Sequence, residues 1–210
     1  PIAPSREGDT VFAADVEGVV MAMDANSGDV EWEIDLDTPI SSALTAIAGQ
    51  VYLATGNGEV IALDQHDGSE EWRSRVSSEV LAAPQANQQL LVVQSVDGRV
   101  AALDRATGEE RWVYTSSQPS LTLRGTGTPM VIDPVSFVGL ANGRLATLDN
   151  RSGQPLWEMQ IATPQGRSEV ERLVDLSGQP IISPDGRLFV TSYNGRVVAL
   201  EATQGIFFFF

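Results

Sequence analysis

Short apolar runs recur along the chain about every 40 residues, and each is followed by a glycine-containing turn and then by a second apolar run. The first runs of these pairs are Thr10–Ala14, Gln50–Ala54, Leu90–Val93, Ser136–Val138 and Leu188–Thr191. The turns are Glu17-Gly18, Asn57-Gly58, Asp97-Gly98, Asn142-Gly143 and Asn194-Gly195. Asn-Gly or Asp-Gly between apolar runs is typical of a β-hairpin and predicts type I′ turns, in which both central residues have positive φ.

A second motif, Asp-x-x-x-Gly-x-x-x-Trp, follows each of the first four hairpins. Its copies contain Asp24, Gly28 and Trp32; Asp64, Gly68 and Trp72; Asp104, Gly108 and Trp112; and Asp149, Gly153 and Trp157. A weaker fifth copy runs from Glu201 through Gly205, with Phe209 at the Trp position. Asp can accept hydrogen bonds from its own turn, and Gly supplies the left-handed conformation of a longer loop. The motif therefore predicts a second hairpin in each unit.

One further strand is expected after each Trp, as in Ile40–Leu44 and Val80–Ala83, which gives four antiparallel strands in every 40 residues. Such a repeat is the pattern of an all-β β-propeller, whose four-stranded blades bury their faces against one another. The whole chain, residues 1–210, is then one array of blades. Its five blade-units centre near residues 10–32, 50–72, 90–112, 136–157 and 188–209. The four repeated Trp side chains are expected to fill the space between neighbouring blades.

The repeat departs from its own spacing at two places. Each Trp follows the hairpin Gly by 14 residues, but the next hairpin Gly follows the four Trp residues by 26, 26, 31 and 38 residues. The extra length lies in two successive connectors, Ser116–Gly125 and Pro164–Asp175. Equivalent connectors of adjacent blades emerge side by side on one face, and insertions of this kind usually carry the function of a repeat protein.

The first long connector places Leu121 and Leu123 on one side of an extended segment, followed by Arg124. Two aliphatic anchors beside a forked cation suit a protein interface. The neighbouring connector offers Glu169, Glu171, Arg172 and Asp175. The alternative is that the Leu pair closes the end of the core while Arg124 pairs with an acid of the next loop. Both interpretations stay open at this point.

The charge and the remaining chemistry exclude several classes of function. The chain has 13 Lys+Arg against 28 Asp+Glu, a net charge of −15, which argues against nucleic-acid binding. It has no Cys, no apolar run as long as the roughly 18 residues of a membrane span, and no nucleotide-binding or nucleophile-elbow motif. His66 lies in a turn and is expected to be solvated, and Asp24–Gly28 fits a turn better than a calcium loop. We therefore expect no catalytic residue, cofactor or metal.

The Asp-x-x-x-Gly-x-x-x-Trp repeat resembles the propeller repeat of the pyrroloquinoline quinone (PQQ) type. Within that group, Ser120–Gly125 together with Glu169–Asp175 is similar to the BamB family, the lipoprotein propellers of the Bam complex. The resemblance implies a non-catalytic scaffold of eight blades on the periplasmic face of the bacterial outer membrane, of which this chain is a partial propeller. It also implies a lipid anchor on an N-terminal Cys, a residue that this chain lacks. An incomplete ring would expose two blade faces, and dimerisation or aggregation is then expected.

The same resemblance implies binding to the POTRA domains of BamA, with other Bam subunits and nascent outer-membrane proteins as further partners. The family's contact motif falls on Leu121, Leu123, Arg124 and Asp175, and Ser177 stands where a second Asp would be. Arg172, beside this motif, is included in the expected partner-binding surface. Two alternatives remain: a fragment of a quinoprotein dehydrogenase, which would need PQQ and calcium, and an extracytoplasmic propeller that binds a different protein.

Overall fold

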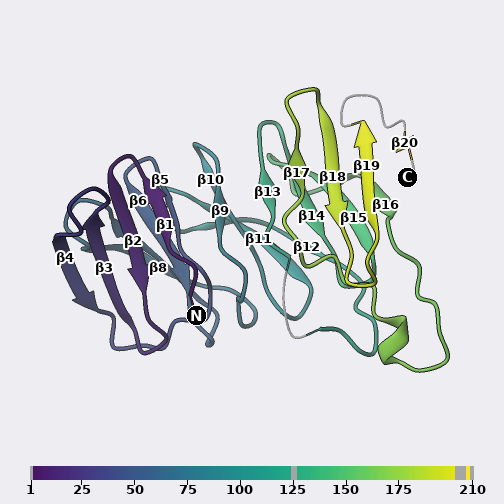
Figure 1. Ribbon diagram of the computed structural model, residues 1–210, viewed down its shortest axis with the longest axis horizontal. Coiled ribbons are helices and arrows are strands. Elements are labelled where there is room, and N and C mark those ends of the chain that lie inside the picture. The colour runs from purple at the N-terminus through teal and green to yellow at the C-terminus, as the bar shows by residue number, and fades with distance from the viewer. Residues whose placement is uncertain (1, 124–126, 202–206, 209–210) are drawn as a thin grey trace.

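The computed structural model describes residues 2–123 and 127–201, together with the backbone of residues 207–208. Five four-stranded antiparallel sheets follow one another along this part of the chain, and each is a simple meander (Figure 1). The prediction of an all-β chain built from five four-stranded units is confirmed. The expected Trp-equivalent of the fifth unit, Phe209, lies outside the described residues, as does Arg124.

The strands of each sheet pair in chain order. Sheet 1 contains β1 (Ser5–Glu7), β2 (Thr10–Ala14), β3 (Val19–Asp24) and β4 (Val30–Asp35). Sheet 2 contains β5 (Thr45–Ile47), β6 (Gln50–Ala54), β7 (Glu59–Asp64) and β8 (Glu70–Arg75). Sheet 3 contains β9 (Gln85–Ala86), β10 (Leu90–Gln94), β11 (Arg99–Asp104) and β12 (Glu110–Thr115).

The last two sheets have the same order, and a short 3₁₀ helix lies in the connector between them. Sheet 4 contains β13 (Met130–Val131), β14 (Val135–Gly139), β15 (Arg144–Asp149) and β16 (Pro155–Gln160). Sheet 5 contains β17 (Ile181–Ile182), β18 (Arg187–Thr191), β19 (Val197–Glu201) and β20 (Phe207–Phe208). The helix is η1 (Val170–Arg172). Among the described residues, no helix is long and apolar enough to cross a membrane.

The Asn-Gly hairpins form where the sequence predicts them, but the predicted type I′ turn is wrong. In the β6–β7 hairpin, the N–H of Gly58 donates to the carbonyl of Thr55 at 3.0 Å, and the N–H of Thr55 donates to the carbonyl of Glu59 at 2.9 Å. Gly58 has a φ of 77°, whereas Asn57 is absent from the described non-glycine residues with positive φ. The loop therefore has three residues, with the single left-handed position on Gly, which is the pattern of a turn followed by a glycine bulge.

The fourth strand of each unit lies a few residues later than expected. Instead of Ile40–Leu44 and Val80–Ala83, the strands are β5 and β9. In sheet 2 the cause is a tight turn at Ala48 and Gly49, which have φ values of 48° and 89°. This turn pairs β5 with β6, so the strand has to end directly before it. The added strand is thus the first of the next meander rather than an extension of the preceding one.

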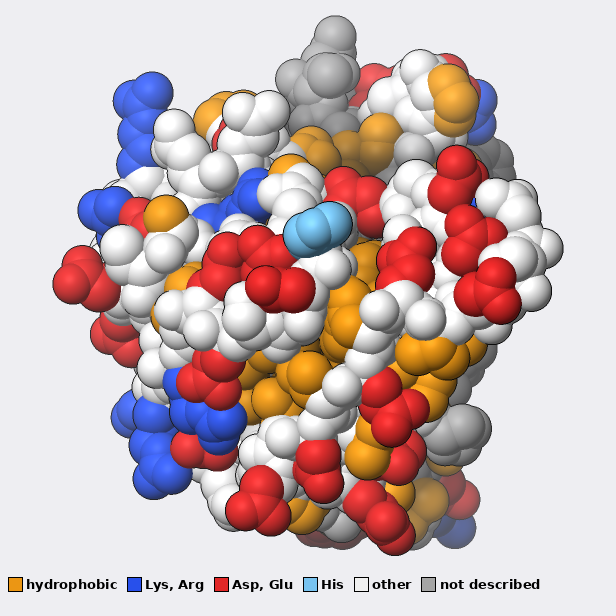
Figure 2. Space-filling view, turned by 90° about the vertical axis from the view of Figure 1, so that its left-hand side faces the viewer, with side chains coloured by type: hydrophobic (Ala, Val, Ile, Leu, Met, Phe, Trp, Pro, Cys, Tyr) orange, Lys and Arg blue, Asp and Glu red, His pale blue; other side chains and the backbone are white. Residues whose placement is uncertain are grey.

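Neighbouring sheets bury an apolar cluster between their faces. Between sheets 1 and 2 the cluster joins Phe12 and Ala22 to Leu53 and Ile61, and equivalent clusters lie at the next three interfaces. Strand side chains alternate between the two faces, so the middle sheets present apolar residues on both sides. Figure 2 faces sheet 1 and shows apolar side chains gathered at the centre of this view, bordered by acidic ones.

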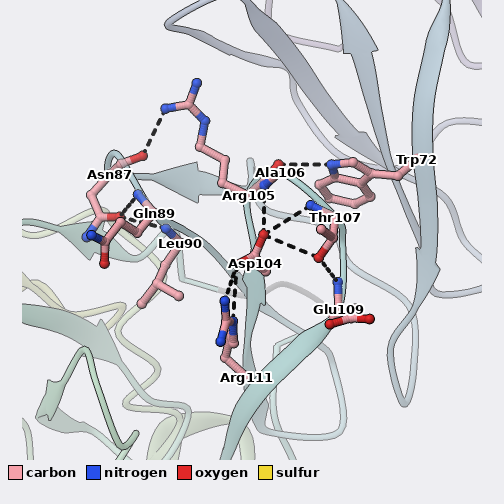
Figure 3. Close-up of polar contacts among 10 residues, drawn as sticks. All are labelled: Trp72, Asn87, Gln89, Leu90, Asp104, Arg105, Ala106, Thr107, Glu109 and Arg111. Atoms are coloured by element: carbon pink, nitrogen blue, oxygen red, sulfur yellow. Dashed lines mark hydrogen bonds and ion pairs between the residues drawn. The ribbon is translucent and has the colours of Figure 1, made fainter.

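The repeated Gly and Trp interlock across these interfaces. The indole N–H of Trp72 in β8 donates to the main-chain carbonyl of Arg105 in the next sheet at 2.9 Å (Figure 3). The ring lies so close to Gly108 that an added Cβ would be 2.6 Å from its Cε3 atom. Gly108 also has a φ of 74°. Trp32 and Trp112 make the same pair of contacts, with Gln65 and Gly68 and with Asn150 and Gly153, respectively.

The Asp of the motif holds the turn onto which the indole docks. The side chain of Asp104 accepts the N–H groups of Ala106 at 3.0 Å and Thr107 at 3.1 Å and pairs with Arg111 (Figure 3). This is the Asx turn that the sequence predicts, and Asp24, Asp64 and Asp149 accept backbone N–H groups in the same way. In the second, third and fourth copies, Asp and Gly therefore shape the turn that receives the Trp of the preceding unit, which joins consecutive units.

Candidate protein-binding surface

The two long connectors lie at the same end of their sheets. The first connector spans residues 116–129, between β12 and β13, and the second connector spans residues 161–180, between β16 and β17. The first residue of each connector is hydrogen-bonded to a hairpin Gly. The N–H of Ser116 donates to the carbonyl of Gly98 at 3.2 Å, and the N–H of Ile161 donates to the carbonyl of Gly143 at 2.9 Å. We call this end of the sheets the connector face. In Figure 1 the second connector is the green loop that carries the 3₁₀ helix and projects below the sheets.

The first connector is held at its base and exposed in its middle. The side chain of Asn142, in the neighbouring hairpin turn, donates to the carbonyl of Ser117 at 3.2 Å. Gln118 covers Gly98, where an added Cβ would overlap its side-chain amide. Beyond this base, Leu121 is 40% exposed and Leu123 is half-buried. Leu121 therefore does not close the end of the core.

The second connector has an exposed outer half that is fixed by its own hydrogen bonds. The Glu171 carboxylate accepts the backbone N–H groups of Arg167 at 2.7 Å and Ser168 at 3.1 Å. The hydrogen bonds from Ser168 and Arg167 lower the pKa of Glu171 below its ordinary value of 4.5. Arg172, at the end of η1, has an exposed side chain, and its N–H donates to the carbonyl of Glu169 at 3.1 Å.

The inner half of the second connector is part of the core. Leu173, Val174 and Leu176 are 7%, 2% and 1% exposed, and Leu176 belongs to the cluster between sheets 4 and 5. The N–H of Leu176 donates to the carbonyl of Leu140 at 3.2 Å. Leu176 closes this end of the interface, with the buried Leu173 and Val174 next to it in the chain, whereas neither Leu of the first connector belongs to this cluster. Sequence reasoning missed the three buried residues, although three aliphatic residues among four positions were a usable signal of burial.

Asp175 links the two connectors. The residue is only 3% exposed, and its Oδ1 atom accepts the main-chain N–H of Leu123 at 3.0 Å. Burial raises the pKa of the Asp175 carboxyl above its ordinary value of 3.8, although the hydrogen bond from Leu123 opposes this change. A second link joins Gln179 of the second connector to the carbonyl of Pro129 in the first at 3.0 Å. The expectation that the two connectors lie together is confirmed by these contacts.

The structure thus brings together three of the five residues that the sequence proposed for a partner surface. Leu121 is exposed, Leu123 is half-buried, and the buried Asp175 accepts a hydrogen bond from the Leu123 backbone. Arg172 lies on the exposed outer half of the second connector. Arg124 lies outside the described residues. The pairs Trp32–Gly68, Trp72–Gly108 and Trp112–Gly153 form joins between sheets and are not part of the connector face.

The connector face offers little space for a small molecule. A cavity of about 20 Å3 lies between the connectors and is lined in part by Gln94, Thr122 and Asp175. A cavity of this size holds about one water molecule. Over the described ranges, no three His, Asp or Glu side chains are grouped so that they could hold a metal ion.

The stacked sheets with their docked Trp residues define the chain as an array of β-propeller blades with PQQ-like repeats. Quinohemoprotein alcohol dehydrogenase from Comamonas testosteroni has a similar fold, with a TM-score of 0.73 over 95% of this chain and 41% of that chain. The two share 17% sequence identity, so this likeness shows the fold alone.

Comparisons with proteins of higher sequence identity identify the family. The family model described as outer membrane protein assembly factor BamB matches residues 1–69 and 17–206. The BamB protein of Pseudomonas aeruginosa is 57% identical over 204 residues, which are 97% of this chain and 53% of the relative. The crystal structure of BamB from Moraxella catarrhalis has a TM-score of 0.93 at 25% identity and covers 99% of this chain and 63% of that chain. The chain belongs to the BamB family and spans about half the length of the relatives it matches.

Proposed function

We propose that this chain is part of a non-catalytic scaffold in the assembly of outer-membrane β-barrel proteins. The scaffold binds the POTRA domains of BamA through the connector face, and it works on the periplasmic side of the outer membrane, held there by a lipid anchor in the full-length protein. Other Bam subunits and nascent outer-membrane proteins are its further partners. Family membership supports the assembly role, because the relatives are named outer membrane protein assembly factors.

One observation carries the docking proposal: Asp175 ties the two connectors together directly beside an exposed Leu121. A preorganised loop loses little conformational entropy on binding, which favours affinity. An exposed aliphatic side chain on such a loop can act as an anchor in a partner's pocket. The buried carboxylate of Asp175 acts through Leu123, since only 3% of the residue is exposed to a partner.

The test is the affinity of this chain for a purified fragment that contains the BamA POTRA domains. We expect Leu121→Ala and Leu123→Ala each to weaken the Kd by about thirtyfold, which corresponds to a hot-spot loss of about 2 kcal/mol. Leu156→Ala is the matched control, because Leu156 is 57% exposed but lies on the outer strand β16. Its Kd should stay within about twofold of the parent value, since surface substitutions away from a contact change little.

Two outcomes would contradict the proposal. If the two connector variants bind the POTRA fragment as tightly as the parent, the connector face is not the docking surface. If the parent chain does not bind the fragment at all, the partner is wrong. Urea unfolding of all variants shows whether a lost affinity comes from a lost contact or from a destabilised fold.

A further inference from the structure

One residue of the connector face is not explained by the fold. The hairpin turns at this face have equivalent positions two residues before the hairpin Gly. These positions hold Val16, Gly56, Val96, Ala141 and Tyr193. Because the turn forms equally well with Gly56 or Ala141 at this place, it does not require a large side chain. An aromatic residue in the fifth turn therefore calls for another reason.

Tyr193 is displayed rather than packed. It is 54% exposed, and its hydroxyl makes no hydrogen bond to any residue that the structure describes. Its turn is nevertheless well fixed, since the N–H of Gly195 donates to the carbonyl of Ser192 at 3.0 Å and Arg196 donates to the carbonyl of Ile161 at 3.2 Å. A fixed turn that presents an exposed aromatic ring is typical of an interface anchor, because aromatic residues lose little side-chain entropy for the area they bury.

Asp175 places this ring beside the first connector. The main-chain carbonyl of Asp175 accepts the N–H of Tyr193 at 2.9 Å, and its side chain accepts the N–H of Leu123 at 3.0 Å. One residue therefore fixes both segments, and the turn that carries Tyr193 lies on the same face as Leu121 and Leu123. In sheet 3 the N–H of Val96 donates to the carbonyl of Glu79 in the same way. The hydrogen bond between the hairpin turn and the preceding connector therefore occurs in more than one unit.

We propose that Tyr193 is a partner-contact residue of the connector face and forms a third apolar anchor with Leu121 and Leu123. This inference rests on the proposed function. The partner that contacts Tyr193 is the same POTRA fragment, which would present an apolar patch to the ring. The contact is made by the ring rather than by the hydroxyl. Leu121 and Leu123 lie in the connector between sheets 3 and 4, and Tyr193 lies in a turn of sheet 5, so the partner would contact more than one unit.

The test compares Tyr193→Ala with Tyr193→Phe in POTRA binding. We expect Tyr193→Ala to weaken the Kd by at least about fivefold and Tyr193→Phe to leave it within about twofold, because the aromatic ring is retained. Tyr193→Ala should fold normally, since Ala141 occupies the equivalent turn, and urea unfolding checks this point. A photoreactive benzoylphenylalanine at position 193 should crosslink to the POTRA fragment, whereas the same group at position 156 should not.

The outcomes separate this inference from the proposed function. If Leu121→Ala and Leu123→Ala weaken binding but Tyr193→Ala does not, the docking proposal stands and the Tyr193 inference is wrong. If Tyr193→Phe weakens the Kd as much as Tyr193→Ala, the hydroxyl makes the contact and the inference is again wrong. If none of the three Ala variants changes the Kd, the docking proposal itself fails.

Discussion

The Oδ1 atom of Asp175 accepts a hydrogen bond from the main-chain N–H of Leu123 at 3.0 Å, although 52 residues separate the two positions. A carboxylate that is only 3% exposed thus fixes the backbone of a loop whose neighbouring residue, Leu121, is 40% exposed. Burying a carboxylate is costly, and a hydrogen bond to its oxygen offsets part of that cost. The structure of the connector face therefore depends on a residue that a partner cannot reach.

Removing this acceptor should loosen the first connector. Asp175→Ala leaves the Leu123 N–H without its partner, so we expect the free energy of unfolding to fall by about 1–3 kcal/mol and the Leu123 amide to exchange faster with solvent. Asp175→Asn keeps a side-chain oxygen in place and should retain most of the protection. Urea unfolding and hydrogen exchange measure the two effects. Equal loss of Leu123 protection in both variants would show that the charge, not the acceptor oxygen, matters.

The aspartates of the repeated turns should make the fold sensitive to acid. Hydrogen bonds lower the pKa of Asp24, Asp104 and Asp149 below the ordinary value of 3.8, with the largest contributions from the Ser27 N–H, the Arg111 side chain and the Ser152 hydroxyl, respectively. A carboxyl whose pKa is lower in the folded state stabilises that state above its unfolded pKa and loses this contribution as pH falls through the folded pKa. Stability should therefore be steady near neutral pH and decline below about pH 4.

Asp149→Asn is the variant that isolates this effect, because Asn can accept the same turn hydrogen bonds but does not titrate. The free energy of unfolding of parent and variant should differ more at pH 7 than at pH 3, as measured by urea titrations at both values. A difference that stays constant between these pH values would contradict the assignment of acid sensitivity to the turn carboxylate.

The sequence predicted the parts of the fold that depend on local chemistry. The turn motifs predicted the hairpins. The interval from the hairpin Gly to the Trp, for example from Gly58 to Trp72, is the same in each of the first four units and predicted that the chain is a series of repeated units. The turn type was wrong because a dipeptide does not reveal the length of its loop: the β6–β7 loop includes Gly56 as well. The position of β5 was wrong because it depends on the tight turn at Ala48 and Gly49, and Ala48 is an unusual residue at positive φ.

The site was predicted in outline, since the two long intervals after Trp112 and Trp157 marked the connectors. The dense aliphatic run that includes Leu173 was a usable signal of burial, and Leu173 is 7% exposed. The 40% exposure of Leu121 could not be predicted, because it depends on how the first connector packs on the ends of the sheets. The Gly–Trp contact was missed for a similar reason, since it joins residues of different units.

The last prediction tests this contact with a matched pair of glycines. Gly153 has a φ of 69° and lies against Trp112, whose Cδ2 atom would be 2.6 Å from an added Cβ, whereas Gly28 has a φ of 77° with nothing within 4 Å of that point. Gly28→Ala should therefore cost only the left-handed backbone term, about 1–2 kcal/mol. Gly153→Ala should cost about 1–3 kcal/mol more, because it also displaces the indole from the turn. Urea unfolding measures the loss of stability in both variants. Equal losses would mean that the packing of the Trp112 ring does not require a glycine at position 153.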